Sequence, residues 1–329
     1  MSVVHRKRRL SLVVVWIGAA SLPFLGECTR QGTTFVAEKP RRYPTDSVEN
    51  AAHRVGVVEG LYGPESVRYS PGQDVYFVSV MNGPGSKKDN NGYIVQIDAG
   101  NLSQAKLFAV SGRNGVRLDA PKGLAIHGDT LWAADIDVLR AFDRFSGKPL
   151  GEIDLKPRGA VLLNDVAVGP DGTIYVTDTG INMSPVGVIY VGGDKVFAIG
   201  PNHSVNVVAH GNVLGRPNGV TWDSTGKRWV VVSFDTFHSE MYALHPSDST
   251  RVILATGKGR FDGIEAISGG RFLVSCWQDS SVHLFSRGAD RQIVRNVPSP
   301  ADIGIDTKRW RLAIPTGNNR VEFWDLAGI

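Results

Sequence analysis

The chain has 329 residues, of which 42% are hydrophobic and 21% charged, with 38 glycines and a net charge of +4. Lysine and arginine are scattered, apart from HRKRR at residues 5–9 and KPRR at residues 39–42, so no nucleic-acid-binding surface is indicated. Two cysteines, Cys28 and Cys276, are too few for a disulfide-built fold, and Cys276 stands in an apolar run typical of core positions.

Residues 1–28 have the layout of an export signal or a membrane anchor. A basic segment precedes the apolar run LSLVVVWIGAASLPFLG at residues 10–26, which is at the lower edge of the length that spans a bilayer. The tetrapeptide LGEC ending at Cys28 resembles a bacterial lipobox, although Glu27 stands where that motif has a small residue. We expect an exported protein, periplasmic or extracellular, with cleavage, lipidation and retention as a membrane anchor left open, and a flexible linker over 29–50.

The segment RVGVVEGL at residues 54–61 is the first strand candidate. It stands before a series of repeated hairpins. In a closed ring of sheets, a strand from one end of the chain often completes the last sheet, because this joins the two ends and removes exposed sheet edges. We therefore expect residues 54–61 to pair with the C-terminal strand.

One sequence pattern, typical of a β-hairpin, recurs along the rest of the chain. Each copy has a polar residue at its head, an alternating run, a Gly-containing turn and a more apolar run. β-branched and aromatic residues are frequent in these runs, which favours strands over helices. The copies are GPESVRYSPGQDVYFVSV from Gly63, PKGLAIHGDTLWAAD from Pro121, LNDVAVGPDGTIYVTD from Leu163, RPNGVTWDSTGKRWVVVSF from Arg216, FDGIEAISGGRFLVSC from Phe261 and ADIGIDTKRWRLAIP from Ala301.

The spacing of the copies predicts the fold. Successive head residues are 40 to 57 positions apart, within the range of a four-stranded propeller blade. We predict an all-β, six-bladed β-propeller with four-stranded blades over residues 51–329, whose inner strands begin around a central, metal-binding channel. The polar insertion MNGPGSKKDNNG at residues 81–92 then lies at a face of the ring, where it would border a site.

The head residues are the candidate site. Four of them carry oxygen donors that a closed ring would bring to one point, and two carboxylates with two carboxamides form a hard, all-oxygen set. Such a set suits one divalent cation, Ca²⁺ above all, which takes about 6 to 8 oxygen ligands; Mg²⁺ and Mn²⁺ are chemically acceptable. The heads are Glu65, Lys122, Asn164, Asn218, Asp262 and Asp302, and the proposed metal ligands are Glu65, Asn164, Asn218 and Asp262.

The alternative for each of these residues is a turn. Asn-Gly, Asp-Gly and Asn-Asp are common turn dipeptides, and Asn218 or Asp262 taken alone would fit that role. The hairpin reversals, however, are already assigned to PGQD, PDG, STG and SGG. The shared phase of the heads therefore favours ligands over turn residues.

These residues also carry a resemblance. Glu65 in GPES, Asn164 in LNDVAVGPDG, Asn218 in RPNGV and Asp262 in FDGI are similar to the metal-binding signature of the senescence marker protein (regucalcin) and gluconolactonase family. That superfamily of six-bladed calcium propellers includes paraoxonase and diisopropyl fluorophosphatase. The similarity covers residues from about 55 to the end. It implies hydrolysis of lactones, or of phosphotriesters in some members, with the metal polarising the carbonyl or phosphoryl oxygen.

The resemblance also implies residue roles. Asp262 would be both a metal ligand and the general base or nucleophile, while Asp165 would hold the ligand shell in place. Lys122 departs from the family pattern, and we leave open whether it orients a substrate carboxylate or points to solvent. His238 is a candidate proton shuttle. Glu265 would help to bind a second, structural cation, or would be a buried hydrogen-bonded carboxylate.

The leading functional hypothesis is an exported, calcium-dependent hydrolase of a lactone or related ester, with a small-molecule substrate and no nucleic-acid partner. The competing hypothesis is a non-catalytic propeller, in which the metal is structural and one face binds a ligand or a protein, because the fold alone does not decide between these classes. A synthase-like relative that condenses instead of hydrolysing is a third alternative, which no residue discriminates.

Overall fold

The computed structural model describes residues 52–184, 187–245 and 250–329. The predicted export signal or anchor at residues 1–28, with its lipobox-like Cys28, and the predicted linker at residues 29–50 lie outside the described residues. Within the described part of the chain, no helix is both long and apolar enough to cross a membrane.

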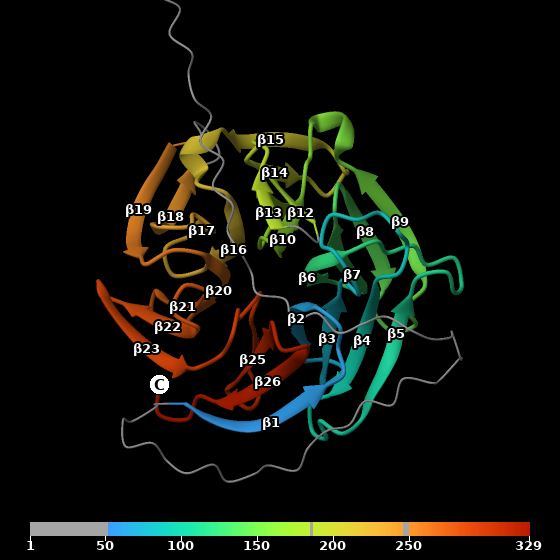
Figure 1. The fold of residues 1–329 in the computed structure, drawn as a ribbon, viewed down its shortest axis with the longest axis horizontal. Helices are drawn as coiled ribbons and strands as arrows, with labels where there is room; N and C mark the ends of the chain where they lie inside the picture. The colour runs from blue at the N-terminus through green and yellow to red at the C-terminus, as the bar shows by residue number, and fades with distance from the viewer. Residues whose placement is uncertain (1–51, 185–186, 246–249) are drawn as a thin grey trace, which may run out of the picture.

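The described residues form six four-stranded antiparallel sheets arranged as blades around an axis (Figure 1). The six-bladed propeller predicted from the repeats is therefore confirmed. Blades one to three are β2 (Pro64–Ser70), β3 (Val75–Val80), β4 (Tyr93–Asp98) and β5 (Ala105–Val110); β6 (Pro121–His127), β7 (Thr130–Asp135), β8 (Val138–Asp143) and β9 (Pro149–Asp154); and β10 (Leu163–Val168), β11 (Ile174–Asp178), β14 (Lys195–Ile199) and β15 (Val205–His210).

The other three blades follow the same order from the axis outwards, except that the last one closes the ring. Blades four to six are β16 (Pro217–Asp223), β17 (Arg228–Ser233), β18 (Ser239–His245) and β19 (Thr250–Gly257); β20 (Phe261–Ile267), β21 (Arg271–Cys276), β22 (Ser281–Ser286) and β23 (Ala289–Arg295); and β24 (Gly304–Asp306), β25 (Arg311–Thr316), β26 (Arg320–Asp325) and β1 (His53–Glu59).

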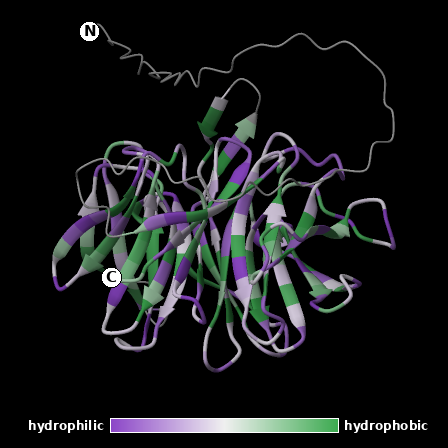
Figure 2. Ribbon diagram, turned by 90° about the horizontal axis from the view of Figure 1, so that it is seen from below, coloured by the Kyte–Doolittle hydropathy of each residue, from purple (hydrophilic) through white to green (hydrophobic). Residues whose placement is uncertain are grey.

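Three short elements lie outside the blades. Two are 3₁₀ helices, η1 (Lys156–Arg158) and η2 (Asn212–Leu214). The third is a hairpin of β12 (Ile181–Ser184) and β13 (Gly187–Tyr190), inserted between β11 and β14. In side view this hairpin stands beyond the ring (Figure 2). It projects from the end at which the inner strands begin, which we call the head face.

Strand β1 closes the ring, as predicted. It pairs antiparallel with β26, from His53 opposite Asp325 to Glu59 opposite Arg320, and forms the outer edge of blade six (Figure 1). Arg54 adds an ion pair across this junction, with its Nη1 3.0 Å from Oε1 of Glu322. The join unites the two ends of the described chain and covers the edge that β26 would otherwise expose.

The hydrophobic core lies between the blades as six apolar layers. Each layer takes buried side chains from two neighbouring sheets, for example Tyr76 and Val95 of blade one with Val321 and Phe323 of blade six. Five similar clusters fill the other blade-to-blade contacts. Because both faces of every sheet are covered, the strands carry apolar residues on both sides. This packing leaves the start of each inner strand near the axis.

Five inner strands have a register irregularity at the head residue. In β10, Leu163 pairs with Asp178 and Val166 with Val176, so two residues oppose the single Thr177. Strands β6, β16 and β20 likewise place two residues opposite one residue of the second strand, and β2 has one extra residue at Glu65. A bulge interrupts the alternation of side chains along the strand and changes the direction in which the side chain of the extra residue points. Five of the six predicted head residues, all but Asp302, therefore lie in strand bulges and are not turn residues.

Glycine after the head allows the inner strands to approach closely. A Cβ on Gly219 would lie 2.5 Å from the backbone oxygen of Asp262 in the next blade. A Cβ on Gly263 would lie 2.6 Å from the Cα of Asp302 in the blade after that. No side chain fits at these two positions without moving backbone, so glycine is needed to bring neighbouring heads together.

Candidate metal centre

The four predicted ligands all lie buried on inner strands, at the same end of the ring. Glu65 comes from blade one, Asn164 from blade three, Asn218 from blade four and Asp262 from blade five, and each side chain is at most 8% exposed. We call them the head layer. Their burial is unusual for polar groups, which normally enter a protein interior only with hydrogen-bond partners.

One oxygen of each head-layer residue has no hydrogen-bond partner. Within the described residues, ten buried side-chain nitrogen or oxygen atoms lack a partner, and four of them belong to this layer. Each unmet acceptor costs about 1 to 3 kcal/mol of desolvation. A set of unpaired oxygens from four different blades is the donor set that a hard cation would satisfy. The unpaired atoms are Glu65 Oε2, Asn164 Oδ1, Asn218 Oδ1 and Asp262 Oδ1.

Neighbouring hydroxyl groups hold this geometry. The amide nitrogen of Asn164 donates to Oγ1 of Thr179 at 2.9 Å, which leaves its oxygen free. Thr179 donates in turn to the backbone oxygen of Pro217 at 2.9 Å, and Thr177 to that of Asn218 at 2.5 Å. These contacts tie blade three to blade four at the positions of two predicted ligands. The hydroxyls therefore fix both the orientation of Asn164 and its spacing from Asn218.

The electrostatics of the head layer are those of a buried acidic site. Burial raises the pKa of Glu65 well above its usual range, and the nearby Asp262 carboxyl raises it further. Burial and Asp302 raise the pKa of Asp262 in the same direction, while the indole of Trp277 opposes the rise. Asp262 of blade five thus influences Glu65 of blade one, so the two carboxyls belong to one buried acidic group.

Lys122 is a buried part of this region, so the alternative that it points to solvent is wrong. It is 1% exposed, and its Nζ donates to the backbone oxygens of Gly85 at 2.6 Å and Ala120 at 3.1 Å. Burial lowers the pKa of Lys122, and Glu65 opposes that shift. Its ammonium group therefore partly balances the head layer and anchors the 81–92 loop.

The 81–92 loop lies at the head face, as expected from the sequence. Besides the contact of Gly85 with Lys122, Ser86 accepts a hydrogen bond from the backbone N–H of Met183 at 2.8 Å. Lys88 pairs with Asp137 of the next blade at 2.5 Å. The loop and the β12–β13 hairpin thus together form a wall on one side of the head face.

The predicted proton shuttle lies in another loop. His238 is exposed in the connection between β17 and β18, and its backbone N–H donates to Asp235 at 3.2 Å. Since β17 runs back towards the head face, this connection belongs to the same end of the ring as the head layer. The structure thus places His238 on the same face of the ring as the head layer.

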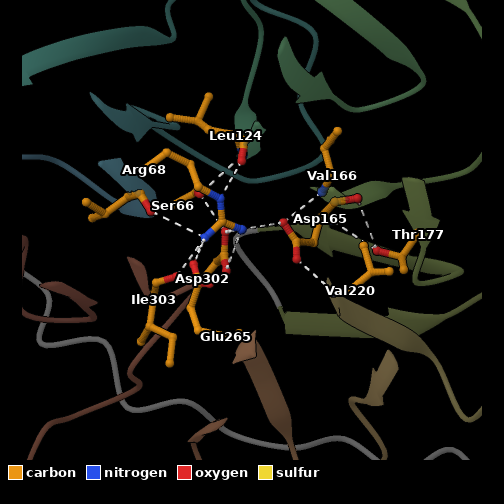
Figure 3. Close-up of polar contacts among 12 residues, drawn as sticks. Ser66, Arg68, Leu124, Asp165, Val166, Thr177, Val220, Glu265, Asp302 and Ile303 are labelled. Carbon is orange, nitrogen blue, oxygen red and sulfur yellow. Dashed lines mark hydrogen bonds and ion pairs between the residues drawn. The ribbon is translucent and has the colours of Figure 1, made fainter. Parts of the chain in front are cut away.

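A second polar layer lies on the inner strands beneath the heads (Figure 3). Its centre is Arg68, which donates to Glu265 at 2.6 Å, to Asp302 at 3.1 Å and to Asp165 at 3.2 Å. We call these four residues the arginine layer. The guanidinium also donates to the backbone oxygens of Leu124 and Ile303. Arg68 of blade one therefore contacts residues from four other blades.

Asp165 holds the frame of the site. It is fully buried, and its Oδ2 accepts the backbone N–H of Val220 at 2.8 Å while its Oδ1 accepts that of Val166 at 2.7 Å. Burial and Asp302 raise the pKa of Asp165, and Arg68 opposes them. Because Asp165 follows Asn164 directly, its contacts pin the bulge of β10 beside β16.

Glu265 has Arg68 as its partner and is a buried, hydrogen-bonded carboxylate, one of its two predicted roles. Burial raises the pKa of Glu265 to about 7, although Arg68 opposes the shift. The guanidinium already supplies positive charge at this position. The predicted second structural cation stays a prediction, and the arginine layer has its own cation.

Sequence analysis missed Arg68 and the hydroxyl groups that support the heads. A charged residue inside an otherwise apolar inner strand is a usable signal for Arg68, because such residues are rarely buried without partners. Thr177 and Ser275 occupy equivalent positions opposite two bulges, and each accepts the backbone N–H of the residue after a head, Asp165 or Gly263. That equivalence becomes visible only once the pairing is known.

A family comparison agrees with the repeat pattern. Residues 148–305 match the model of the SMP-30/gluconolactonase/LRE-like region. This chain carries a gluconolactonase-like region. The resemblance expected from GPES, LNDVAVGPDG, RPNGV and FDGI is therefore confirmed, and the matched region contains three of the four head-layer residues. A search of curated protein sequences gave no match.

Solved structures share the propeller at low sequence identity. A gluconolactonase from Xanthomonas campestris is 16% identical, with a TM-score of 0.59 over 82% of this chain and 89% of that one. A luciferin-regenerating enzyme is 11% identical, with a TM-score of 0.59 over 82% and 94%. A chain of a nidogen/laminin complex is 16% identical, with a TM-score of 0.55 over 73% and 92%. These likenesses concern the fold alone.

Proposed function

We propose that the chain is a divalent-cation-dependent hydrolase of lactones or related esters. The observation that carries the proposal is the set of four buried, unpaired oxygens in the head layer. The gluconolactonase-like region supports a lactonase-type activity. Ca²⁺ is the ion we propose, because the donors are all oxygen and two of them bring negative charge.

The residues present fit such an ion. Glu65, Asn164, Asn218 and Asp262 would hold it, leaving positions for water and substrate. When bound, the cation supplies polarisation of the substrate carbonyl and a lowered pKa for a bound water. The proposed reaction needs no other chemistry from the cation.

Asp262 is the residue we propose as general base. Asp262 is buried in the head layer, where a cation bound to its carboxylate would keep it ionised beside a water held by the same ion. The indole of Trp277 lies against it and lowers its pKa, in opposition to burial. Lys122 lowers the pKa of Glu65 and so opposes part of the rise that burial and Asp262 cause. Asp165 and Thr179 keep the ligands in place.

The deciding experiment combines metal analysis with a panel of lactones, aryl esters and phosphotriesters. We expect about one equivalent of Ca²⁺ and hydrolysis of lactones, with both lost in Asp262→Ala. Asp129→Ala is the matched control, because Asp129 is an exposed aspartate in the β6–β7 turn at the opposite end of an inner strand. Full activity of Asp262→Ala would end the proposal.

A binding platform is the second candidate, favoured by the apolar hairpin on the head face. Val188, Ile189 and Val191 are 39%, 57% and 55% exposed. Exposed apolar groups of this kind commonly contact a partner or a ligand. If the cation is retained, chelation lowers the melting temperature and no compound in the panel is hydrolysed, this candidate replaces the enzyme.

A further inference from the structure

A second cluster of metal-ligating groups lies in blade five, outside the head layer. Cys276 ends β21, Asp279 is in the turn that follows, and His283 is in β22. The Cys276 sulfur, an Asp279 carboxylate oxygen and an imidazole nitrogen of His283 lie within 4.8 Å of one another. Cys276 is 1% exposed, and the side chains of His283 and Asp279 are 7% and 11% exposed.

The imidazole of His283 is held by a carboxylate on each side. Its Nδ1 is 2.6 Å from Oδ1 of Asp290, and its Nε2 is 3.1 Å from Oδ2 of Asp279. The Ser281 hydroxyl lies 2.8 Å from the same Nε2. A carboxylate on the outer ring nitrogen is the arrangement that orients metal-binding histidines and raises their basicity. Asp290 thus leaves Nε2 facing Asp279 and Cys276.

The charges of the cluster suit a dication. Asp279 and Asp290 place two carboxylates beside the imidazole of His283. Lys258, with its Nζ 3.7 Å from Asp279, is mostly exposed. A dication bound there would take the place of the thiol proton and balance the carboxylates.

We propose that Cys276, Asp279 and His283 form a site for a thiophilic divalent cation such as Zn²⁺. One sulfur, one nitrogen and one oxygen ligand select a softer ion than the all-oxygen head layer does. Ligand atoms on tetrahedral zinc lie roughly 3.3 to 3.8 Å apart, so the observed separations require only a small inward movement. Water or Ser281 would complete the coordination.

The site would fix part of the wall of the candidate metal centre. The ligands span residues 276–283 and enclose the turn that contains Trp277, whose indole lies against Asp262. Phe261, which precedes Asp262, pairs with Cys276 across the sheet. Metal at this position would therefore hold Trp277 without taking part in the proposed chemistry.

The competing explanation is a hydrogen-bonded cluster that binds no metal. Cys276 donates to the backbone oxygen of Gly259 at 3.3 Å, and Gln292 donates to Asp279 at 2.8 Å. These contacts occupy the same groups. The two explanations differ in one observable, which is the formation of a metal–thiolate bond.

Titration of the metal-free full-length chain with Co²⁺ tests the site, with excess Ca²⁺ present to fill the head layer. We expect a thiolate-to-cobalt charge-transfer band that saturates at one equivalent and is displaced by Zn²⁺. Cys276→Ser should abolish the band, and Cys28→Ser, which changes the other cysteine, should keep it. Absence of the band, or its persistence in Cys276→Ser, overturns the proposal.

A second variant keeps the test independent of folding defects. The side chain of Asp290 is 43% exposed, so Asp290→Asn should fold, and we expect its Co²⁺ affinity to fall by roughly 10- to 100-fold. Unchanged affinity in Asp290→Asn would contradict the assigned geometry. The readout is metal binding alone, so the result does not depend on whether the chain hydrolyses lactones.

Discussion

The head layer and the arginine layer occupy neighbouring levels of the same inner strands, and both bury several acidic groups. In the arginine layer, Asp165, Asp302 and Glu265 all accept hydrogen bonds from the guanidinium of Arg68. In the head layer, Glu65 and Asp262 each keep one buried oxygen without a partner in the described residues. The acids of one layer are thus paired within the chain, whereas the other layer keeps acceptors that a bound cation would satisfy.

This difference separates stability from function. A buried charge that loses its partner costs several kcal/mol, so the arginine layer should be needed for folding. A layer of unpaired acceptors opposes folding and is retained where it binds something. Changes in the two layers should therefore have opposite effects on stability and activity.

The largest expected effect is on activity in the head layer. Asp262→Asn keeps the size of the side chain and removes its charge, and we expect hydrolysis to fall by roughly 10² to 10⁴-fold. The melting temperature of the metal-free protein should be unchanged or higher, since a buried charge is removed. Kinetics on the best substrate and calorimetry in chelator measure both. A less stable, fully active variant would reverse the assignment of the two layers.

The next effect is on stability in the arginine layer. Arg68→Met keeps much of the side-chain volume but leaves Asp165, Asp302 and Glu265 without their cation. We expect a loss of about 3 to 5 kcal/mol in the free energy of unfolding. Chemical denaturation measures this loss, with Arg113→Met as control, because Arg113 is an exposed arginine in a loop of blade one. Equal stability of the two variants would show that the layer does not support the fold.

A pH effect should follow from Glu265. Its pKa is about 7 in the folded chain, above the ordinary 4.5, so its ionisation is less favourable folded than unfolded. This group therefore removes stability as pH rises from about 4.5 to 7, by at most about 3 kcal/mol. Relative to wild type, Glu265→Gln should gain stability between pH 5 and pH 8. A difference that is constant with pH would mean that the carboxylate is ionised throughout.

The smallest effect concerns the orientation of one ligand. Thr179→Val removes the acceptor that fixes the amide of Asn164. We expect the affinity for Ca²⁺ to fall by roughly 10- to 100-fold with the fold retained. Isothermal titration measures the affinity. Thr173→Val in the exposed β10–β11 turn is the matched control, and an equal loss in both variants would remove Thr179 from the site.

The sequence by itself determined the repeat and its phase. Polar heads before alternating runs, at the spacing of blades, predicted six blades, the closing strand and the residues of the head layer, because period-two patterning and regular turns are local properties. The order and spacing of RPNGV and LNDVAVGPDG were enough for the family resemblance. These features need no knowledge of what lies beside each strand.

Only the tertiary structure decided in which direction the head side chains point and which groups compensate the buried charges. The bulges that turn Asn164, Asn218 and Asp262 out of the alternation depend on pairing with the second strand of each blade. Closure of the ring places Arg68 among acids from three other blades. The fold of one sheet places Cys276 beside His283. Such contacts join residues far apart in sequence or across strands, and a linear pattern carries no record of distance in space.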